Sequence, residues 1–136
     1  MKRVLGLDVG AKRIGVALSD ALGITAQRLT LIERRDVAQD LDVIASLVAK
    51  HDVATVVVGL PLTMKGEMGE QARLVMAFVE QLRARLSCSV EMVDERLTTV
   101  EGERALLSMD ASRRTRKGLI DQVAAQLILQ SYLNGR

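Results

Sequence analysis

The sequence predicts an α/β fold in which helices cover the faces of a mixed β-sheet. Three strand-like runs follow one another at the N-terminus, and beyond residue 36 helical and strand-like segments alternate. Strands joined by a short turn pair antiparallel, whereas strands separated by a helix can pair parallel. This order of segments therefore favours a sheet with both kinds of pairing. The length of 136 residues, without an internal repeat or linker, predicts a single domain over residues 1–136.

The first three strands are predicted over residues 2–9, 13–19 and 26–32. Gly10 and Gly15 bracket the turn between the first two runs, a spacing that is typical of an antiparallel hairpin. The third run has enough β-branched and apolar residues to complete a three-stranded meander.

The middle of the chain predicts one helix followed by one buried strand. Apolar residues recur at helical spacing over residues 36–50, and Asp36 is suited to cap the start of this helix. The uninterrupted valines of residues 55–58 predict a strand that is covered on both faces. The sequence Gly59-Leu60-Pro61 ends that strand and begins a loop.

The second half of the chain predicts three helices, one strand and a basic loop. In chain order, these are a helix over residues 70–86, a strand over 89–94, a helix from Thr98 or Thr99 to about Met109, a polar and basic loop over 110–117, and a helix over 119–133.

Composition excludes several classes of function. Aromatic residues make up only 1% of the chain, so unpaired bases would find almost nothing to stack on, and a nucleic acid would be recognised through its backbone and shape. The single Cys88 cannot form an internal disulfide, and no Cys/His cluster predicts a structural zinc site. Because the chain has no long apolar segment and no signal-peptide pattern, we expect a cytoplasmic protein without a membrane partner.

Three apolar segments carry a carboxylate where a buried element would normally have none. Asp8 lies near the end of the first strand, Glu95 follows the strand over 89–94, and Asp121 lies on the apolar stripe of the last helix. A buried carboxylate must be protonated, paired or bound to a metal, because its desolvation is costly. We therefore predict that the three acids meet at a divalent-metal site.

Each acid also has a simpler explanation. Asp8 could accept hydrogen bonds from the amides of the turn that follows it. Glu95 could be a surface residue at the start of a helix, and Asp121 could stabilise the dipole of a first helical turn. Adjacent residues of a strand point to opposite faces, so only one of Asp94 and Glu95 can face Asp8, and the alternation alone does not decide which one.

Together these residues form a pattern that resembles the YqgF family. The matching segments, in chain order, are Leu7-Asp8-Val9-Gly10 with Arg13-Ile14-Gly15-Val16-Ala17, then Val57-Val58-Gly59-Leu60-Pro61-Leu62, then Val93-Asp94-Glu95-Arg96-Leu97-Thr98-Thr99, and finally Lys117 through Asp121 before an Ala-rich helix. The resemblance extends over nearly the full chain. That family belongs to the RNase H-like superfamily and is described as a pre-16S ribosomal RNA nuclease and a Holliday-junction-resolvase-like protein.

The resemblance implies an RNase H-like fold, with a five-stranded mixed sheet, helices on both faces and acids gathered at one edge. It places the first-strand acid at Asp8, the second at Glu95 and the third at Asp121, while Asp94 could assist. Carboxylate oxygens suit hard cations, so the expected cofactor is Mg²⁺ or Mn²⁺. Whether one or two ions bind is left open.

From these residues we expect a metal-dependent endonuclease that hydrolyses phosphodiester bonds in structured nucleic acid. The substrate would be an rRNA precursor or a branched DNA, and a homodimer is one of the open oligomeric states. Seven basic residues would hold the flanking phosphates: Lys12, Arg13, Arg96, Arg113, Arg114, Arg116 and Lys117. Short basic runs are more often plain solvated surface.

Two other functions stay open from the sequence. One is a non-catalytic nucleic-acid-binding or ribosome-assembly factor, in which the acids have a structural role. The other is a relative of the actin-like ATPases and sugar kinases, which share the strand order. Those proteins close two such domains around a nucleotide, and the length of this chain supplies only one.

Overall fold

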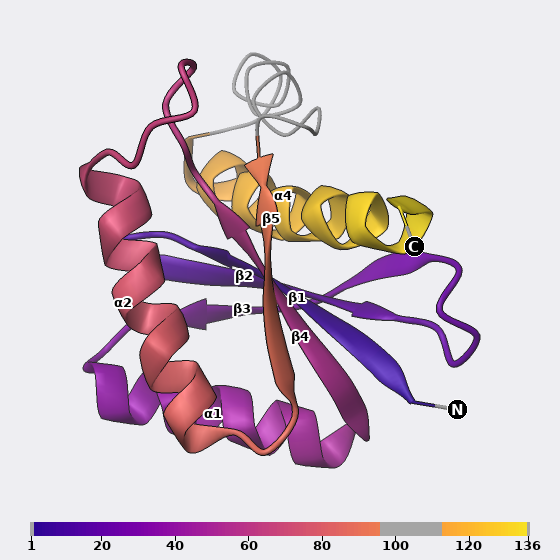
Figure 1. Cartoon of the computed structure of the whole chain (residues 1–136). Coiled ribbons are helices and arrows are strands. Elements are labelled where there is room, and N and C mark those ends of the chain that lie inside the picture. The colour runs from indigo at the N-terminus through magenta and orange to yellow at the C-terminus, as the bar shows by residue number, and fades with distance from the viewer. Residues whose placement is uncertain (1, 96–112, 136) are drawn as a thin grey trace.

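Five strands form one mixed sheet (Figure 1), in a computed structural model that describes residues 2–95 and 113–135. The strands are β1 (Arg3–Val9), β2 (Arg13–Ser19), β3 (Ala26–Glu33), β4 (Val53–Leu60) and β5 (Ser89–Asp94), in the spatial order β3-β2-β1-β4-β5. The pairs β1–β2 and β2–β3 are antiparallel, and the pairs β1–β4 and β4–β5 are parallel. The predicted five-stranded mixed sheet is therefore confirmed.

Helices cover both faces of this sheet, as predicted. Helices α1 (Val37–Lys50) and α2 (Glu70–Arg85) lie on one face, and α4 (Arg113–Gly135) crosses the other (Figure 1). Helix α1 begins where predicted, because the Asp36 side chain accepts a hydrogen bond of 2.8 Å from the Gln39 amide. In the part of the chain described here, no helix has the length and apolar character needed to span a membrane.

Two strands are longer than predicted because their pairing continues past the apolar run. Strand β4 extends to Leu60, which pairs with Asp94, and β3 extends to Glu33, which pairs with Arg13. Ladder hydrogen bonds can therefore hold polar or glycine-containing ends in strand conformation. The helix predicted from Thr98 or Thr99 to Met109 lies outside the described residues.

The prediction of a basic loop up to residue 117 is wrong for the described residues 113–117, because α4 begins at Arg113. Arginine and lysine are good helix formers, and a glycine inside a helix costs only about 1 kcal/mol relative to alanine. Gly118 therefore does not stop a helix that packs across several strands of the sheet. Asp121 is consequently the ninth residue of α4 and does not lie in its first turn.

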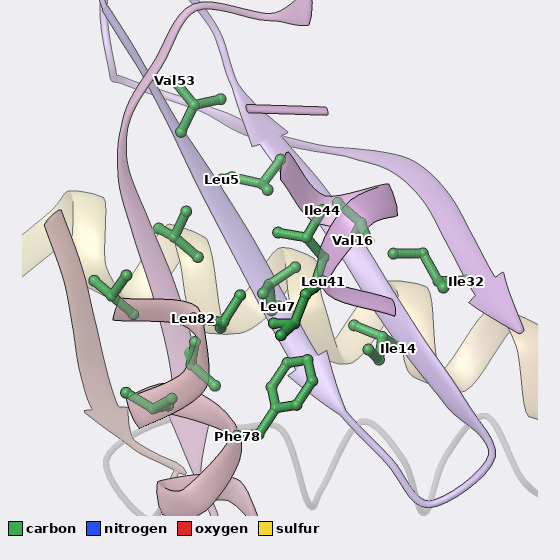
Figure 2. Packing of buried hydrophobic residues seen from close by; sticks show 14 of the residues in the cluster. Leu5, Leu7, Ile14, Val16, Ile32, Leu41, Ile44, Val53, Phe78 and Leu82 are labelled. Atoms are coloured by element: carbon green, nitrogen blue, oxygen red, sulfur yellow. The ribbon is translucent and has the colours of Figure 1, made fainter. Parts of the chain in front are cut away.

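Large apolar side chains fill the space between the sheet and helices α1 and α2 (Figure 2). Leu7 and Ile14 from the sheet, Ile44 from α1 and Phe78 and Leu82 from α2 are all fully or almost fully buried. Strand alternation brings every second residue of β1, β2 and β4 into this layer. This face therefore holds the larger of the two cores.

Smaller residues line the opposite face, where α4 packs on the sheet. Ala17 and Val57 from the strands contact Ala125, Ile128 and Leu129 from the helix, and all five are buried. Small side chains on a sheet allow a helix to approach it closely. The position of α4 therefore depends on residues that leave space.

The core on the α1 and α2 face predicts a clear contrast between two neighbouring residues of α1. Ile44 is fully buried, whereas Val43 is 43% exposed. We expect Ile44→Ala to lower the free energy of unfolding by about 2–5 kcal/mol. The control Val43→Ala should change it by about 0.5 kcal/mol or less. Urea denaturation followed by far-UV circular dichroism measures both, and equal effects would contradict this packing.

Candidate active site

A cavity of about 360 Å³ lies at the edge of the sheet where β1 and β4 end. It is lined by Asp8, Val9, Gly10, Pro61, Gln71, Glu95 and Asp121. The structure therefore brings the three acids singled out by the sequence to one cavity, from β1, from the end of β5 and from α4. This is the edge at which open α/β sheets commonly bind ligands.

Asp8 reaches this cavity because of its place in β1. Leu7 and Val9 point into the core under α1 and α2, so alternation turns Asp8 toward the face covered by α4. The residue opposite Asp8 on β2 is Gly15. Asp8 is only 5% exposed, so its carboxylate is almost entirely withdrawn from bulk water.

Of the two adjacent acids at the end of β5, Glu95, which directly follows the strand, is the one that lines the cavity. Val93 packs in the α4 layer, and Met92 packs in the opposite core. Glu95 follows the strand, and its side chain lies on the α4 side, because a Cβ atom on Gly59 would meet both Ile128 of α4 and the Glu95 carboxylate. Glu95 is 5% exposed. The geometry thus selects Glu95 over Asp94 as the neighbour of Asp8.

Gly59 makes room for the Glu95 side chain. Strand β4 lies between β1 and β5, so Glu95 must extend over β4 to share a cavity with Asp8. A Cβ atom on Gly59 would lie 2.7 Å from the Glu95 Oε1 atom. Any side chain at this position would therefore displace the carboxylate.

Asp121 is placed by a second glycine. A Cβ atom on Gly15 would overlap the carbonyl oxygen of Asp121, so the backbone of α4 rests directly on β2 at this point. Ala124, Ala125 and Ile128, which share a helix face with Asp121, are buried against the sheet. As the ninth residue of α4, Asp121 lies beyond the range in which a carboxylate stabilises the helix dipole.

The predicted phosphate-binding residues do not line this cavity where the structure describes their side chains. Lys12 is exposed in the turn just beyond Gly10, and Arg13 lies 3.5 Å from Glu33 in an ion pair at the start of β2. A partly exposed ion pair of this kind contributes at most about 1 kcal/mol to stability. Arg96 lies outside the described residues. Four further basic residues lie on α4, with side chains outside the described set: Arg113, Arg114, Arg116 and Lys117.

The donor atoms of the cavity suit a hard cation, because carboxylate oxygens are the preferred ligands of Mg²⁺ and Mn²⁺. Among the described side chains, however, no three His, Cys, Asp or Glu residues are grouped so that they could hold a metal ion as they stand. The three acids thus share a cavity without forming a closed set of ligands.

Sequence reasoning did not identify Gln71, which also lines the cavity. It lies in the first turn of α2, and an exposed glutamine at a helix start carries no distinctive pattern. Pro61, from the segment that was expected to end the strand and begin a loop, also lines the cavity. The loop from Pro61 to Gly69 joins the end of β4 to the start of α2. Its short length could have suggested that the first turn of α2, which contains Gln71, lies near the end of β4.

The fold defines the class of the protein. It matches T. thermophilus RuvC in complex with a Holliday junction substrate with a TM-score of 0.62 and 13% identity, over 100% of this chain and 96% of that chain. The match shows the RNase H-like fold of the resolvases.

Sequence comparison identifies the family. The model of RuvX, described as Holliday junction resolvase, matches residues 2–135. Proteins named "Putative pre-16S rRNA nuclease" from Moorella thermoacetica and Halothermothrix orenii are 54% and 48% identical to this chain, each over 97% of it and 94% of the relative. The chain belongs to the RuvX family, which is the YqgF family that its motifs resemble, and it is a nuclease by class.

The contact between Gly15 and α4 predicts a large effect of one added methyl group. We expect Gly15→Ala to lower the free energy of unfolding by about 3 kcal/mol, the upper end of the range for overpacking, because the Asp121 carbonyl cannot move without α4. The control is Gly135→Ala, since nothing lies within 4 Å of a Cβ at Gly135. Thermal and urea denaturation compare the two. Equal stability of both variants would contradict the close approach of α4.

Proposed function

We propose that the protein is a metal-dependent endonuclease that hydrolyses phosphodiester bonds in structured nucleic acid. The observation that supports this most is the convergence of Asp8, Glu95 and Asp121 on one cavity at the edge of the sheet. The family description and the names of the two relatives support nucleic acid as the substrate. Asp8, Glu95 and Asp121 are the proposed catalytic residues.

The proposed cofactor is Mg²⁺ or Mn²⁺, held by Asp8, Glu95 and Asp121. The lack of a closed three-residue ligand set among the described side chains is compatible with Mg²⁺, which usually keeps several waters and binds one or two carboxylates together with substrate phosphates. When bound, the ion would activate a water and stabilise the charge that develops at the phosphate.

The protein groups have separate tasks in this proposal. The burial of Asp8 and Glu95 would restrict the movement of their carboxylates and the access of water to them. Asp121 is partly exposed and would be the most accessible of the three acids. Outside the cavity, the proposed phosphate-binding residues would hold the nucleic acid on either side of the cleaved bond: Lys12, Arg13, Arg96, Arg113, Arg114, Arg116 and Lys117.

The proposed substrate is a precursor of ribosomal RNA or a branched DNA such as a four-way junction. With so few aromatic residues, recognition would depend on the phosphate backbone and on the shape of the nucleic acid. Symmetric cleavage of a junction needs two active sites, so this substrate would require a homodimer. Cleavage of an RNA precursor needs one site only.

The second candidate is a nucleic-acid-binding or ribosome-assembly factor without activity of its own. The observation in its favour is that no described group of side chains forms a complete metal site. The two functions differ in one outcome, because only the nuclease gives a product that depends on a divalent metal.

We expect Asp8→Asn to reduce cleavage by a factor of about 100 or more, the scale on which one group that stabilises the transition state acts. Asn keeps the size of the side chain but loses the charge that would attract a cation. The assay compares a four-way DNA junction and a precursor rRNA fragment, each with Mg²⁺, Mn²⁺ or a chelator.

The matched control for this assay is Asp42→Asn. Asp42 is an exposed acid on α1 that pairs with Arg85, outside the cavity, so its replacement should leave cleavage unchanged. Full activity of a highly purified Asp8→Asn protein would refute the assignment of Asp8. Tight binding of either substrate, with no product at high protein concentration, would support the second candidate.

The position of Lys12 predicts a change in the salt dependence of binding. We expect Lys12→Ala to weaken binding of nucleic acid and to reduce the slope of log K against log salt concentration by about 0.9, the value for one lost contact with a duplex phosphate. The control Lys50→Ala removes an exposed lysine at the end of α1. This lysine directly precedes β4 and therefore lies near the N-terminal end of that strand, whereas the cavity lies near its C-terminal end. Fluorescence anisotropy at several salt concentrations measures both slopes, and identical slopes would exclude a phosphate contact of Lys12.

A further inference from the structure

Arg34 connects the turn after Asp8 to both helices on the far face of the sheet. Its Nη1 atom donates a hydrogen bond of 2.9 Å to the Gly10 carbonyl, and its Nε atom lies 3.0 Å from the Asp40 carboxylate of α1. Its guanidinium carbon lies 5.1 Å from the centre of the Phe78 ring of α2. One side chain therefore links the turn between β1 and β2 to α1 and α2.

Asp40 makes this link firm. Its side chain is only 2% exposed, and its second oxygen accepts a hydrogen bond of 3.0 Å from the Arg35 amide. A charge-assisted pair in a buried setting is stronger than a neutral hydrogen bond, and its planar guanidinium has a defined orientation. The Arg34 backbone adds to the link, because its amide donates to the Lys12 carbonyl at 2.9 Å.

The turn between β1 and β2 is not of the type that best matches the twist of the flanking strands. The Gly10 amide donates to the Arg13 carbonyl at 2.8 Å, so Ala11 and Lys12 form a short hairpin loop. The tightest hairpins adopt positive φ at their central residues, which matches the twist of the strands. Neither Ala11 nor Lys12 has a positive φ. The loop is therefore not one of these turns, and the contacts of Arg34 restrain it from outside.

Gly10 is the second residue after Asp8, and both line the cavity. We propose that Arg34 is a positioning residue, which holds the Gly10 carbonyl and thereby fixes the end of β1 and the direction of the Asp8 carboxylate. Displacement of a catalytic group by about 1 Å can reduce a rate by a factor of about 100. The part of the proposal that concerns catalysis rests on the nuclease function proposed above.

The test compares the variants Arg34→Met and Arg83→Met. Methionine keeps an apolar side chain against Phe78 but removes the donors to Gly10 and Asp40. Arg83 is a matched control, because its Nε and Nη2 atoms both donate to a backbone carbonyl, that of Val90, at 3.3 and 3.0 Å. Val90 lies near the N-terminal end of β5, whereas the cavity lies near the C-terminal end of that strand.

Two measurements are made on each variant: kcat and KM for cleavage, and hydrogen exchange of the Gly10 amide by NMR. For Arg34→Met we expect kcat to fall by about 10- to 100-fold with KM within about twofold, because the lost interaction orients the reacting groups. We also expect exchange of the Gly10 amide to be at least tenfold faster relative to amides of the core. Arg83→Met should leave kcat and the exchange rate of the Gly10 amide unchanged. Arg34→Lys should give values of both quantities between those of Arg34→Met and of the wild-type protein.

A fourth variant separates the positioning role from simple unfolding. Arg34→Met leaves the buried Asp40 charge without its guanidinium, so the double variant Arg34→Met/Asp40→Asn removes that charge while keeping an acceptor for the Arg35 amide. If the double variant is folded and its kcat is within twofold of that of Arg83→Met, the positioning role is wrong. If Gly10 exchange is unchanged, the link itself is wrong, even should the wild-type protein show no cleavage. Failure of the proposed function has a different signature, namely binding of nucleic acid by the wild-type protein without any metal-dependent product.

Discussion

The close approach of α4 to the sheet is the constraint on which the candidate site depends. Adjacent strands β1, β2 and β4 each have a glycine where they face this helix: Gly6, Gly15 and Gly59. A Cβ on Gly6 would lie 2.7 Å from the Leu129 Cβ, and one on Gly15 would overlap the Asp121 carbonyl. Because side chains would force the helix outward, these glycines determine how far Asp121 lies from the acids of the sheet.

The two faces of the sheet therefore contribute differently to the site. Large residues such as Leu7 and Phe78 make the face under α1 and α2 a dense core, and Arg34 joins that core to the turn after Asp8. On the face under α4, small residues allow the helix to lie close to the sheet. Asp8, at the end of β1, is therefore supported by the core on one face of the sheet and shares a cavity with Asp121 on the other face. Precise sites need both a fixed group and a rigid support.

The sequence predicted the features that arise from local periodicity. The five strands, the cap at Asp36 and the place of Asp8 at a strand end all follow from patterns within a few residues. The start of α4 could not be predicted, because packing across the sheet outweighs the weak helix-breaking tendency of Gly118. The choice of Glu95 over Asp94 depends on which face of β5 meets α4, and this is a long-range property.

The sequence pattern could not predict the contacts of Arg34 either. Arg34 and Arg35 are adjacent basic residues before a helix, and nothing in their spacing distinguishes the one that turns inward. The distinction appears only when Asp40, Gly10 and Phe78 come together from α1, the β1–β2 turn and α2. The close contacts at the glycines could not be predicted either, because a glycine in a strand does not indicate which element will pack against it.

The separation of charge at this end of the sheet would couple the binding of the cation and of the nucleic acid in the proposed nuclease. Acids occupy the cavity, none of its described lining residues is basic, and Lys12 and Arg13 lie outside it. A phosphate held by the outer basic residues would be repelled by the acids if they were ionised and alone. A divalent cation in the cavity would reverse that repulsion, so the cation and the nucleic acid should each strengthen the binding of the other by the same free energy. In the proposed nuclease, the acids would therefore act against substrate binding without the cation, and binding of the nucleic acid would be coupled to the state that can cleave.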